Sequence, residues 1–258
     1  MKISALASGS SGNCFFIENT KNNQSVLVDA GIPSKKIEER LSDINKTPEK
    51  VKAILITHEH SDHIRGADIF SRKFNIPIFI TKKTAQATSS LTTLDSTNFI
   101  RNNETLKLAG IEIQVFSKSH KAADPIFFSL TKNSKKVSVI TDAGYTCENI
   151  IDAISSSNFL CLESNHDEQI LAQGHYPAFL KAWIRSDIGH LSNKQAAICT
   201  LEHGKSRLKN IILSHLSENN NTPEEAMNTW NYLISQRRDL KPNITVSLRD
   251  FATPLVKV

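Results

Sequence analysis

Four side chains that can bind a metal ion lie within a stretch of six residues. The segment reads Thr57-His58-Glu59-His60-Ser61-Asp62-His63, and imidazole and carboxylate groups at this spacing suit one or two divalent ions. It follows an apolar run typical of a strand and precedes an apolar stripe typical of a helix. In an extended chain His58 and His60 point the same way, and Asp62 and His63 can face back toward them. We interpret the segment as part of a metal site, the alternative being a histidine-rich loop without a ligand.

Three more potential ligands follow apolar runs elsewhere in the chain. His120 follows the run that ends at Phe116, Asp142 follows Val139-Ile140, and His215 follows Ile211-Ile212-Leu213. Loops at the carboxyl ends of strands commonly build functional sites. Each of the three residues alone fits an ordinary loop residue, but together with the histidine-rich run they indicate one shared metal site.

The elements that must position these residues alternate along the chain. Strands are predicted at residues 25–29, 53–57, 76–80, 111–115, 137–140, 159–162, 210–213 and 244–247. Apolar stripes predict helices over 37–44 and 64–74, and the capping residues Ser192 and Thr222 predict two more. The polar stretches 81–104 and 216–222 are predicted to be loops. Without a repeat or a linker, the pattern favours a single α/β domain over residues 1–258, with two sheets and helices outside.

The order of an early aspartate, the histidine-rich run, and then a histidine, an aspartate and a histidine resembles the metallo-β-lactamase superfamily. The resemblance covers nearly the whole chain. Four further segments look like the YycJ/WalJ group of exonucleases in that superfamily: residues 6–14, 163–167, 189–193 and 213–217. The resemblance implies the α/β fold called an αββα sandwich, with two mixed sheets, helices on the outer faces and a two-metal site.

The resemblance also implies a ligand set. One metal ion would be held by His58, His60 and His120, and the other by Asp62, His63 and His215. Asp142 would bridge the two ions. Asp29 would orient the ligand imidazoles from behind.

These donors are all nitrogen or oxygen atoms, which suits Zn, Mn or Fe. Two divalent ions would generate a bridging hydroxide near neutral pH and neutralise charge on a phosphodiester during in-line attack. No cysteine stands at a ligand position, which disfavours a β-lactamase. The leaving oxygen needs a proton, and by the resemblance we expect His190 to be the general acid, with a structural loop histidine as the alternative.

Candidate substrate contacts flank the donors. The helix that starts at Ser192 could offer backbone N–H groups to a phosphate. The glycine-rich loop with Ser10 and Asn13 either faces a phosphate or is a plain hairpin turn between the first two strands. Six basic residues would hold a nucleic-acid backbone if they share a face with the metals, or else belong to solvated surface: Lys181, Arg185, Lys194, Lys205, Arg207 and Lys209.

Composition limits the class of protein. The 258 residues include 31 Lys and Arg against 26 Asp and Glu, a formal charge of +5 that makes a polyanionic partner plausible. The four cysteines have no C-x-x-C spacing and are predicted to be reduced. Neither a signal peptide nor a membrane-spanning run is evident, so we expect a cytoplasmic protein without a membrane partner. No pattern sets an oligomeric state.

Three functions compete at this stage. The first is a two-metal phosphodiester hydrolase acting on DNA ends, a 5′-to-3′ DNA exonuclease. The second is a small-molecule phosphodiesterase, for example for a cyclic substrate, or another metallohydrolase of the same superfamily. The third, a non-hydrolytic metal or redox protein, would need a carboxylate in place of one histidine of the run and a flavin domain, and the chain has neither.

Overall fold

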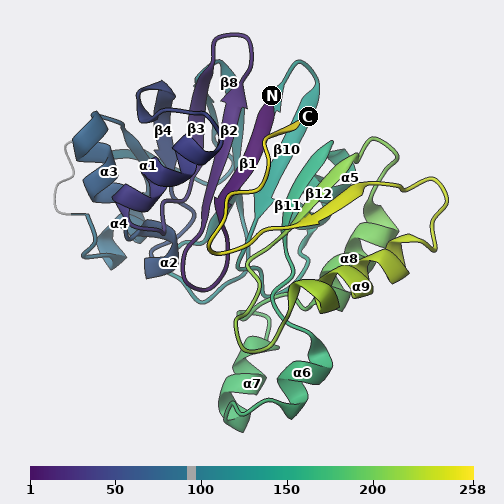
Figure 1. Ribbon diagram of the computed structural model, residues 1–258. Coiled ribbons are helices and arrows are strands. Elements are labelled where there is room, and N and C mark those ends of the chain that lie inside the picture. The colour runs from purple at the N-terminus through teal and green to yellow at the C-terminus, as the bar shows by residue number, and fades with distance from the viewer. Residues whose placement is uncertain (92–96) are drawn as a thin grey trace. The chain divides into compact units, whose positions relative to one another are not determined.

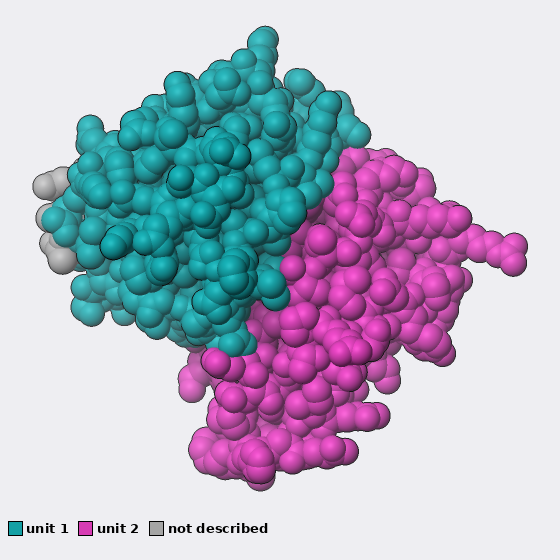
Figure 2. Space-filling view, viewed as in Figure 1, with its two compact units in different colours: residues 1–117, 122–135, 247–258 teal, residues 118–121, 136–246 magenta. Residues whose placement is uncertain are grey.

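A computed structural model describes residues 1–91 and 97–258, and its strands form two mixed sheets (Figure 1). The chain forms two compact units, which Figure 2 shows in different colours. Unit 1 comprises residues 1–117, 122–135 and 247–258, and unit 2 comprises residues 118–121 and 136–246. A single domain over residues 1–258 therefore stays a prediction.

Unit 1 contains the whole first sheet, in the order β14-β1-β2-β3-β4-β5-β6. The pairings from β14 to β3 are antiparallel and those from β3 to β6 are parallel. The strands are β1 (Lys2–Ala7), β2 (Cys14–Asn19), β3 (Gln24–Val28), β4 (Val51–Leu55), β5 (Ile78–Thr81), β6 (Thr97–Ile100) and β14 (Val256–Lys257). Unit 1 also supplies the antiparallel strands of the second sheet, β7 (Thr105–Leu108), β8 (Ile111–Ser117) and β9 (Ile126–Lys132).

Unit 2 supplies the parallel strands of the second sheet. They are β10 (Lys135–Ile140, in unit 2 from Lys136 on), β11 (Phe159–Glu163), β12 (Asn210–Ser214) and β13 (Asn243–Val246). β11 is buried along its whole length, as expected for a parallel strand covered on both faces. Because the strands run in parallel, their carboxyl ends lie at one edge of the sheet.

The helices cover the sheets within each unit. Unit 1 has α1 (Ser34–Asp43), α2 (Ser61–Ile64), α3 (Ala67–Phe74) and α4 (Lys82–Ala87), and unit 2 has α5 (Glu148–Ser156), α6 (Glu168–Gln173), α7 (Ala178–Ile184), α8 (Asn193–His203) and α9 (Pro223–Ile234). In unit 1, Ile37 and Leu41 of α1 and Phe70 of α3 join Phe16 and Leu27 of the sheet in one apolar core. Full burial of a side chain of this size contributes roughly 1.5–3 kcal/mol.

The predicted strands are all present, with ends shifted by up to two residues. The capping predictions are also confirmed, because Ser192 and Gln195 form a reciprocal capping box at α8 and the Thr222 hydroxyl accepts the Glu225 N–H at α9. Across residues 1–91 and 97–258, no helix is long and apolar enough to cross a membrane.

The prediction of a loop over residues 81–104 is wrong. The stretch contains α4 and β6, and residues 92–96 lie outside the described residues. The Thr81 hydroxyl caps α4 by accepting the Thr84 N–H. β6 pairs with β5 at the edge of the first sheet and exposes Asn98 and Phe99. Edge strands commonly carry polar residues. β6 was therefore not recognised from a continuous apolar run. Residues 216–222 contain neither helix nor strand, as predicted.

Candidate metal centre

The histidine-rich run of unit 1 follows β4 and leads into α2. His58 Nε2 and His60 Nδ1 lie 3.1 Å apart. Two nitrogen ligands at 2.0–2.1 Å from a tetrahedral zinc ion are about 3.3 Å apart. The observed separation of 3.1 Å therefore suits a shared cation. Asp62 Oδ2 lies 3.4 Å from His63 Nε2, so a carboxylate and an imidazole also meet at the start of α2.

Asp29 fixes the orientation of this run from a fully buried position after β3. Its carboxylate accepts hydrogen bonds from the Thr57 N–H (2.8 Å) and hydroxyl (2.9 Å), and His63 Nδ1 lies 2.6 Å from Oδ2. A carboxylate beside Nδ1 keeps the proton there and leaves Nε2 as the electron-pair donor. Because the Thr57 hydroxyl donates to Asp29, it accepts from His58 Nδ1 at 2.9 Å. These are the contacts expected of a residue that orients ligand imidazoles.

The glycine-rich loop between β1 and β2 supports the run rather than standing apart from it. The Asn13 N–H donates to the Asp62 carbonyl (2.7 Å), and the buried Asn13 amide lies 3.2 Å from His63 Nε2. Ser8 and the Gly9 N–H donate to the other end of that amide. The loop is therefore a hairpin connection that braces the donors. Ser10 is exposed, and contact of Ser10 or Asn13 with substrate stays a prediction.

Unit 2 gathers a second set of donors at the carboxyl ends of its strands. Asp142 Oδ1 lies 3.6 Å from His120 Nε2 and 3.5 Å from His215 Nε2. Both imidazoles therefore present the same nitrogen to one carboxylate oxygen. His120 Nδ1 lies 3.1 Å from the Gly189 carbonyl, which can only accept, so the ring proton is on Nδ1 and Nε2 is the donor atom. Burial lowers the pKa of His120 to about 4, against the opposing charge of Asp142.

Glu163, at the end of β11, was missed as a site residue by sequence reasoning. Its Oε1 lies 2.9 Å from both His190 Nδ1 and His215 Nδ1, and its Oε2 accepts the N–H groups of Ala143 and Leu191. Burial alone raises the pKa of this carboxyl, but the charge on His190 and hydrogen bonds from His190 and His215 outweigh burial and bring the pKa to about 2. The available signal was an acidic residue ending an apolar run, the pattern already seen at Asp142.

His190 shares the Glu163 carboxylate but is less enclosed than the other histidines of the cluster. Its side chain is 12% exposed, and Nδ1 lies 3.6 Å from Asp142 Oδ1. The Trp183 ring packs edge-on against the imidazole, with centroids 5.6 Å apart and an interplanar angle of 87°. With Nδ1 held by Glu163, Nε2 is the nitrogen left for proton exchange. Potential ligand atoms of Asp142, Glu163, His190 and His215 all lie within 4.8 Å of one another.

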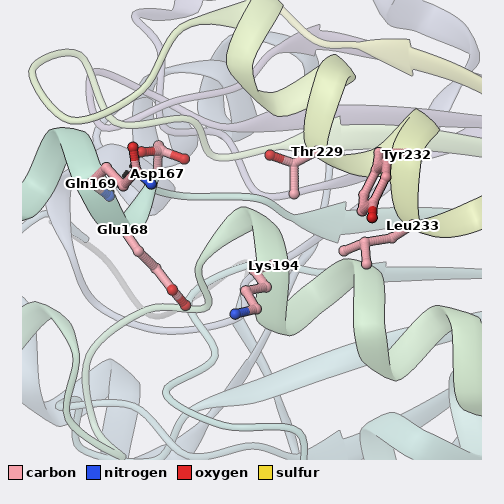
Figure 3. Close-up of a pocket in the computed structure, with 7 residues that line it drawn as sticks. All are labelled: Asp167, Glu168, Gln169, Lys194, Thr229, Tyr232 and Leu233. Carbon is pink, nitrogen blue, oxygen red and sulfur yellow. Dashed lines mark hydrogen bonds between the residues drawn. The ribbon is translucent and has the colours of Figure 1, made fainter.

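Ser192 is occupied by structural contacts. Its buried hydroxyl accepts the Gln195 N–H and donates to Glu168 Oε1 at 3.0 Å. Figure 3 shows Glu168 and Lys194 beside a cavity of about 260 Å³ that is also lined by Asp167, Gln169, Thr229, Tyr232 and Leu233. A carboxylate thus already stands at the start of α8, where a phosphate was expected. A substrate contact by Ser192 stays a prediction.

The donor chemistry in each unit fits divalent metal ions. Four of the predicted ligand histidines have Nδ1 beside an oxygen atom of a neighbouring residue: His58, His63, His120 and His215. This arrangement leaves Nε2 of each ring as the electron-pair donor, which is the usual condition of a metal-binding histidine. His60 differs, because its Nδ1 faces His58 Nε2.

The sequence matches the family model of the metallo-beta-lactamase superfamily over residues 7–154. The chain belongs to this superfamily, and the predicted fold class is confirmed. Among solved structures, it resembles the metallo-beta-lactamase fold protein YhfI from Bacillus subtilis, with 17% identity, a TM-score of 0.71 and coverage of 98% of both chains. It also resembles Zn(2+)-bound PqqB from Methylobacterium extorquens, with 14% identity, a TM-score of 0.70 and coverage of 98% and 99%.

Two curated relatives show which group within the superfamily the chain resembles. The chain is 38% identical to Exodeoxyribonuclease WalJ of Streptococcus pneumoniae serotype 2 (strain D39 / NCTC 7466), over 100% of this chain and 98% of the relative. It is 35% identical to Exodeoxyribonuclease YycJ of Bacillus anthracis, over 92% of this chain and 90% of the relative. The predicted resemblance to the YycJ/WalJ group is confirmed.

Proposed function

We propose that this chain is a metal-dependent hydrolase that removes nucleotides from DNA ends, in the 5′-to-3′ direction and in the cytoplasm. The similarity to two proteins named exodeoxyribonucleases, over nearly the full length of all three chains, supports DNA as the substrate. The observation that carries the hydrolase is the shared hydrogen bonding of His190 and His215 with Glu163. It ties a candidate ligand and a candidate proton donor to one ionised carboxylate.

The metal ligands in this proposal come from both units. Seven side chains hold two divalent ions, Zn, Mn or Fe: His58, His60, Asp62, His63, His120, Asp142 and His215. Membership of the superfamily and the Nδ1 contacts of the histidines support this set. When bound, divalent ions lower the pKa of a coordinated water and neutralise charge on a phosphodiester.

His190 serves as the general acid in this proposal. Glu163 accepts a hydrogen bond from the Nδ1–H group of His190 and holds the imidazole in one orientation. The Trp183 ring packs against the same imidazole. Nε2 can then deliver a proton to the leaving oxygen of the cleaved bond. General acid catalysis of this kind contributes about 10²–10⁴-fold to the rate.

A nuclease assay on end-labelled duplex DNA tests the proposal. The wild type, Asp62→Ala, His190→Ala and the exposed-site control His175→Ala are compared with and without added Mn²⁺ or Zn²⁺. We expect Asp62→Ala to be inactive, His190→Ala to lose about 10²–10⁴-fold in kcat while retaining its metal, and His175→Ala to match the wild type. A 5′ label should be released before a 3′ label.

Equal activity of the wild type and Asp62→Ala would overturn the metal-dependent mechanism. Cleavage of closed circular DNA at a rate comparable to that of linear DNA would overturn action on ends. Early release of a 3′ label would reverse the proposed polarity while leaving the hydrolase itself intact.

A further inference from the structure

A group of exposed basic side chains lies on unit 2, far along the sheet from its metal donors. Asp142, Glu163 and His215 stand at the carboxyl ends of β10, β11 and β12. The basic residues come from the segments that precede β12 and β13, at the amino ends of these parallel strands. β12 runs from Asn210 to Ser214, and at about 3.3 Å per residue its two ends are roughly 13 Å apart. The basic group and the donors therefore occupy opposite edges of the parallel strands.

The two segments that carry the basic group are joined to each other. Arg237 Nη1 donates to the carbonyls of Leu201 (2.6 Å) and Gly204 (2.9 Å). Further on, the Asn243 N–H donates to the Lys209 carbonyl (2.8 Å). These contacts hold residues 205–209 beside residues 237–243. We call the exposed cations on these two segments the basic patch: Lys205, Arg207, Lys209, Arg238 and Lys241.

The two segments of the basic patch contain one acidic residue, Asp239, which also feels the charge of Lys205. The neighbouring acid, Asp239, forms its ion pair with Arg237, which contacts both carboxylate oxygens. Within the part of the chain that the structure describes, the five patch residues form no ion pair. Unit 2 as a whole has as many acidic as basic residues, so the patch is a local concentration of positive charge. Such a surface attracts polyanions.

A cavity of about 370 Å³ opens beside the patch. Its lining includes the cations Arg238 and Lys241 and the apolar residues Ile234, Leu240 and Ile244. This volume is at the small end of ligand sites, which span about 300–1,000 Å³. Ile234 and Leu240 are buried, so the cavity offers its two cations to a phosphate rather than an apolar platform to a base.

We propose that the basic patch is a second DNA-binding surface, which holds the phosphate backbone of a DNA segment remote from the end being hydrolysed. The inference rests on the proposed function for the identity of the polyanion. The patch offers charge rather than a fixed array of base-edge donors, so it binds DNA without reading its sequence. It gives Lys205, Arg207 and Lys209 a role that does not require them to lie beside the metals.

Binding in EDTA separates this surface from catalysis. The variant Lys205→Gln/Arg207→Gln/Arg238→Gln/Lys241→Gln is compared with the wild type and with a control that loses four exposed lysines of unit 1, Lys35→Gln/Lys52→Gln/Lys107→Gln/Lys135→Gln. Binding of a fluorescent 60-base-pair duplex is measured by anisotropy from 50 to 200 mM salt. If each cation contacts one phosphate, the patch variant should reduce the slope of log K against log salt by about 3–4. The control variant should change this slope by less than the patch variant does.

Hydrolysis provides the second readout. The patch variant should retain the wild-type kcat and KM on a dinucleotide, which at about 3.4 Å per nucleotide in a duplex strand is shorter than the distance along β12. It should show a raised KM on long DNA. An unchanged salt slope, or an equal loss in the control, would overturn the second surface. Normal patch-dependent binding by a wild type without nuclease activity would overturn the proposed function and leave the DNA-binding surface standing.

Discussion

At the scale of single residues, Glu163 connects two histidines of the candidate site with the backbone around them. One oxygen faces His190 and His215, and the other accepts the backbone N–H groups of Ala143 and Leu191. A carboxylate that is buried and ionised must be surrounded by such donors to be stable. Glu163 therefore sets which nitrogen each of the two histidines offers.

Replacement of Glu163 by Gln should test this role. A neutral amide cannot accept at one oxygen from two imidazoles with the strength of a carboxylate, so His215 loses its orientation. We expect metal affinity to fall about 10–100-fold and stability to fall by about 1.5–3 kcal/mol. Competition with a chromogenic chelator measures the affinity. The exposed-site control Glu202→Gln should change neither quantity, and a Glu163→Gln protein with wild-type affinity would contradict the assignment.

His166 should make the metal-free protein sensitive to acid. Burial lowers the pKa of His166 to about 4 from an ordinary 6.5. Between pH 4 and pH 6.5 this side chain is therefore protonated in the unfolded chain and neutral in the folded chain. Stability should therefore be complete above pH 6.5 and decline toward pH 4, by up to roughly 3 kcal/mol from this residue at 1.36 kcal/mol per pKa unit. His120, whose pKa is also lowered to about 4, adds a decline of the same sign.

Chemical denaturation in EDTA at pH 7, 6, 5 and 4 measures this decline. His166→Gln should show a shallower dependence on pH than the wild type, with the His120 contribution remaining. The same substitution at the exposed His175 should leave the wild-type dependence in place. Parallel curves for the wild type and His166→Gln would show that His166 is not the proton-excluding group.

At the scale of the elements, the ends of parallel strands place the donors. Asp29 follows β3, Asp142 follows β10 and His215 follows β12. All three residues have left-handed backbone angles, with φ of 59°, 51° and 57°. This conformation is uncommon for residues other than glycine, and Asp and His adopt it more readily than most other residues. Each strand thus ends in a sharp turn that directs a side chain into the candidate site.

Gly31 lies where the loop after β3 packs closely against the start of α2. A Cβ atom there would be 1.7 Å from the Asp62 carbonyl oxygen, so any larger residue must push the loop after β3 away from the start of α2. We expect Gly31→Ala to cost about 3 kcal/mol or more in stability and to weaken metal binding as well.

Thermal unfolding and metal titration measure the effect of Gly31→Ala. Gly174→Ala is the matched control, because a Cβ there would be 3.0 Å from the Ile170 carbonyl and the backbone can adjust. A Gly31→Ala protein with wild-type metal affinity would show that the loop after β3 does not position Asp62.

The sequence predicted most strands, and it indicated candidate donor residues, for a physical reason. Buried parallel strands need continuous apolar runs, and polar residues at the ends of such runs stand out. The run from His58 to His63 is also local, so its spacing is visible without the fold. The contacts of Asp29 with Thr57 and His63 span 28 and 34 residues, and only the family resemblance indicated them.

Other features depend on tertiary contacts that spacing does not encode. Backbone N–H groups at the start of the helix after Ser192 were expected to meet a phosphate. The carboxylate of Glu168, 24 residues away, lies there instead and accepts from the Ser192 hydroxyl. β6 is too polar to be recognised without its partner β5. The joining of residues 205–209 with residues 237–243 depends on β12 pairing with β13. Individual basic residues were therefore visible in the sequence, but the basic patch that they form together was not.

At the scale of the whole molecule, the candidate ligands are divided between the two units. His58, His60, Asp62 and His63 belong to unit 1, whereas His120, Asp142 and His215 belong to unit 2. The short segment 118–121, which carries His120, is part of unit 2 although the residues on either side of it are part of unit 1. Under the proposed ligand set, binding of two metal ions requires both units to be folded.

The central claim is that these seven side chains hold two divalent ions, and metal content per folded chain tests it most directly. Elemental analysis and native mass spectrometry of the wild type should find two ions per chain. Asp142→Asn, which removes the proposed bridging carboxylate, should retain at most one, and the exposed-site control Asp152→Asn should retain both. A folded wild type that binds no divalent ion, or an Asp142→Asn protein that keeps two, would contradict the account.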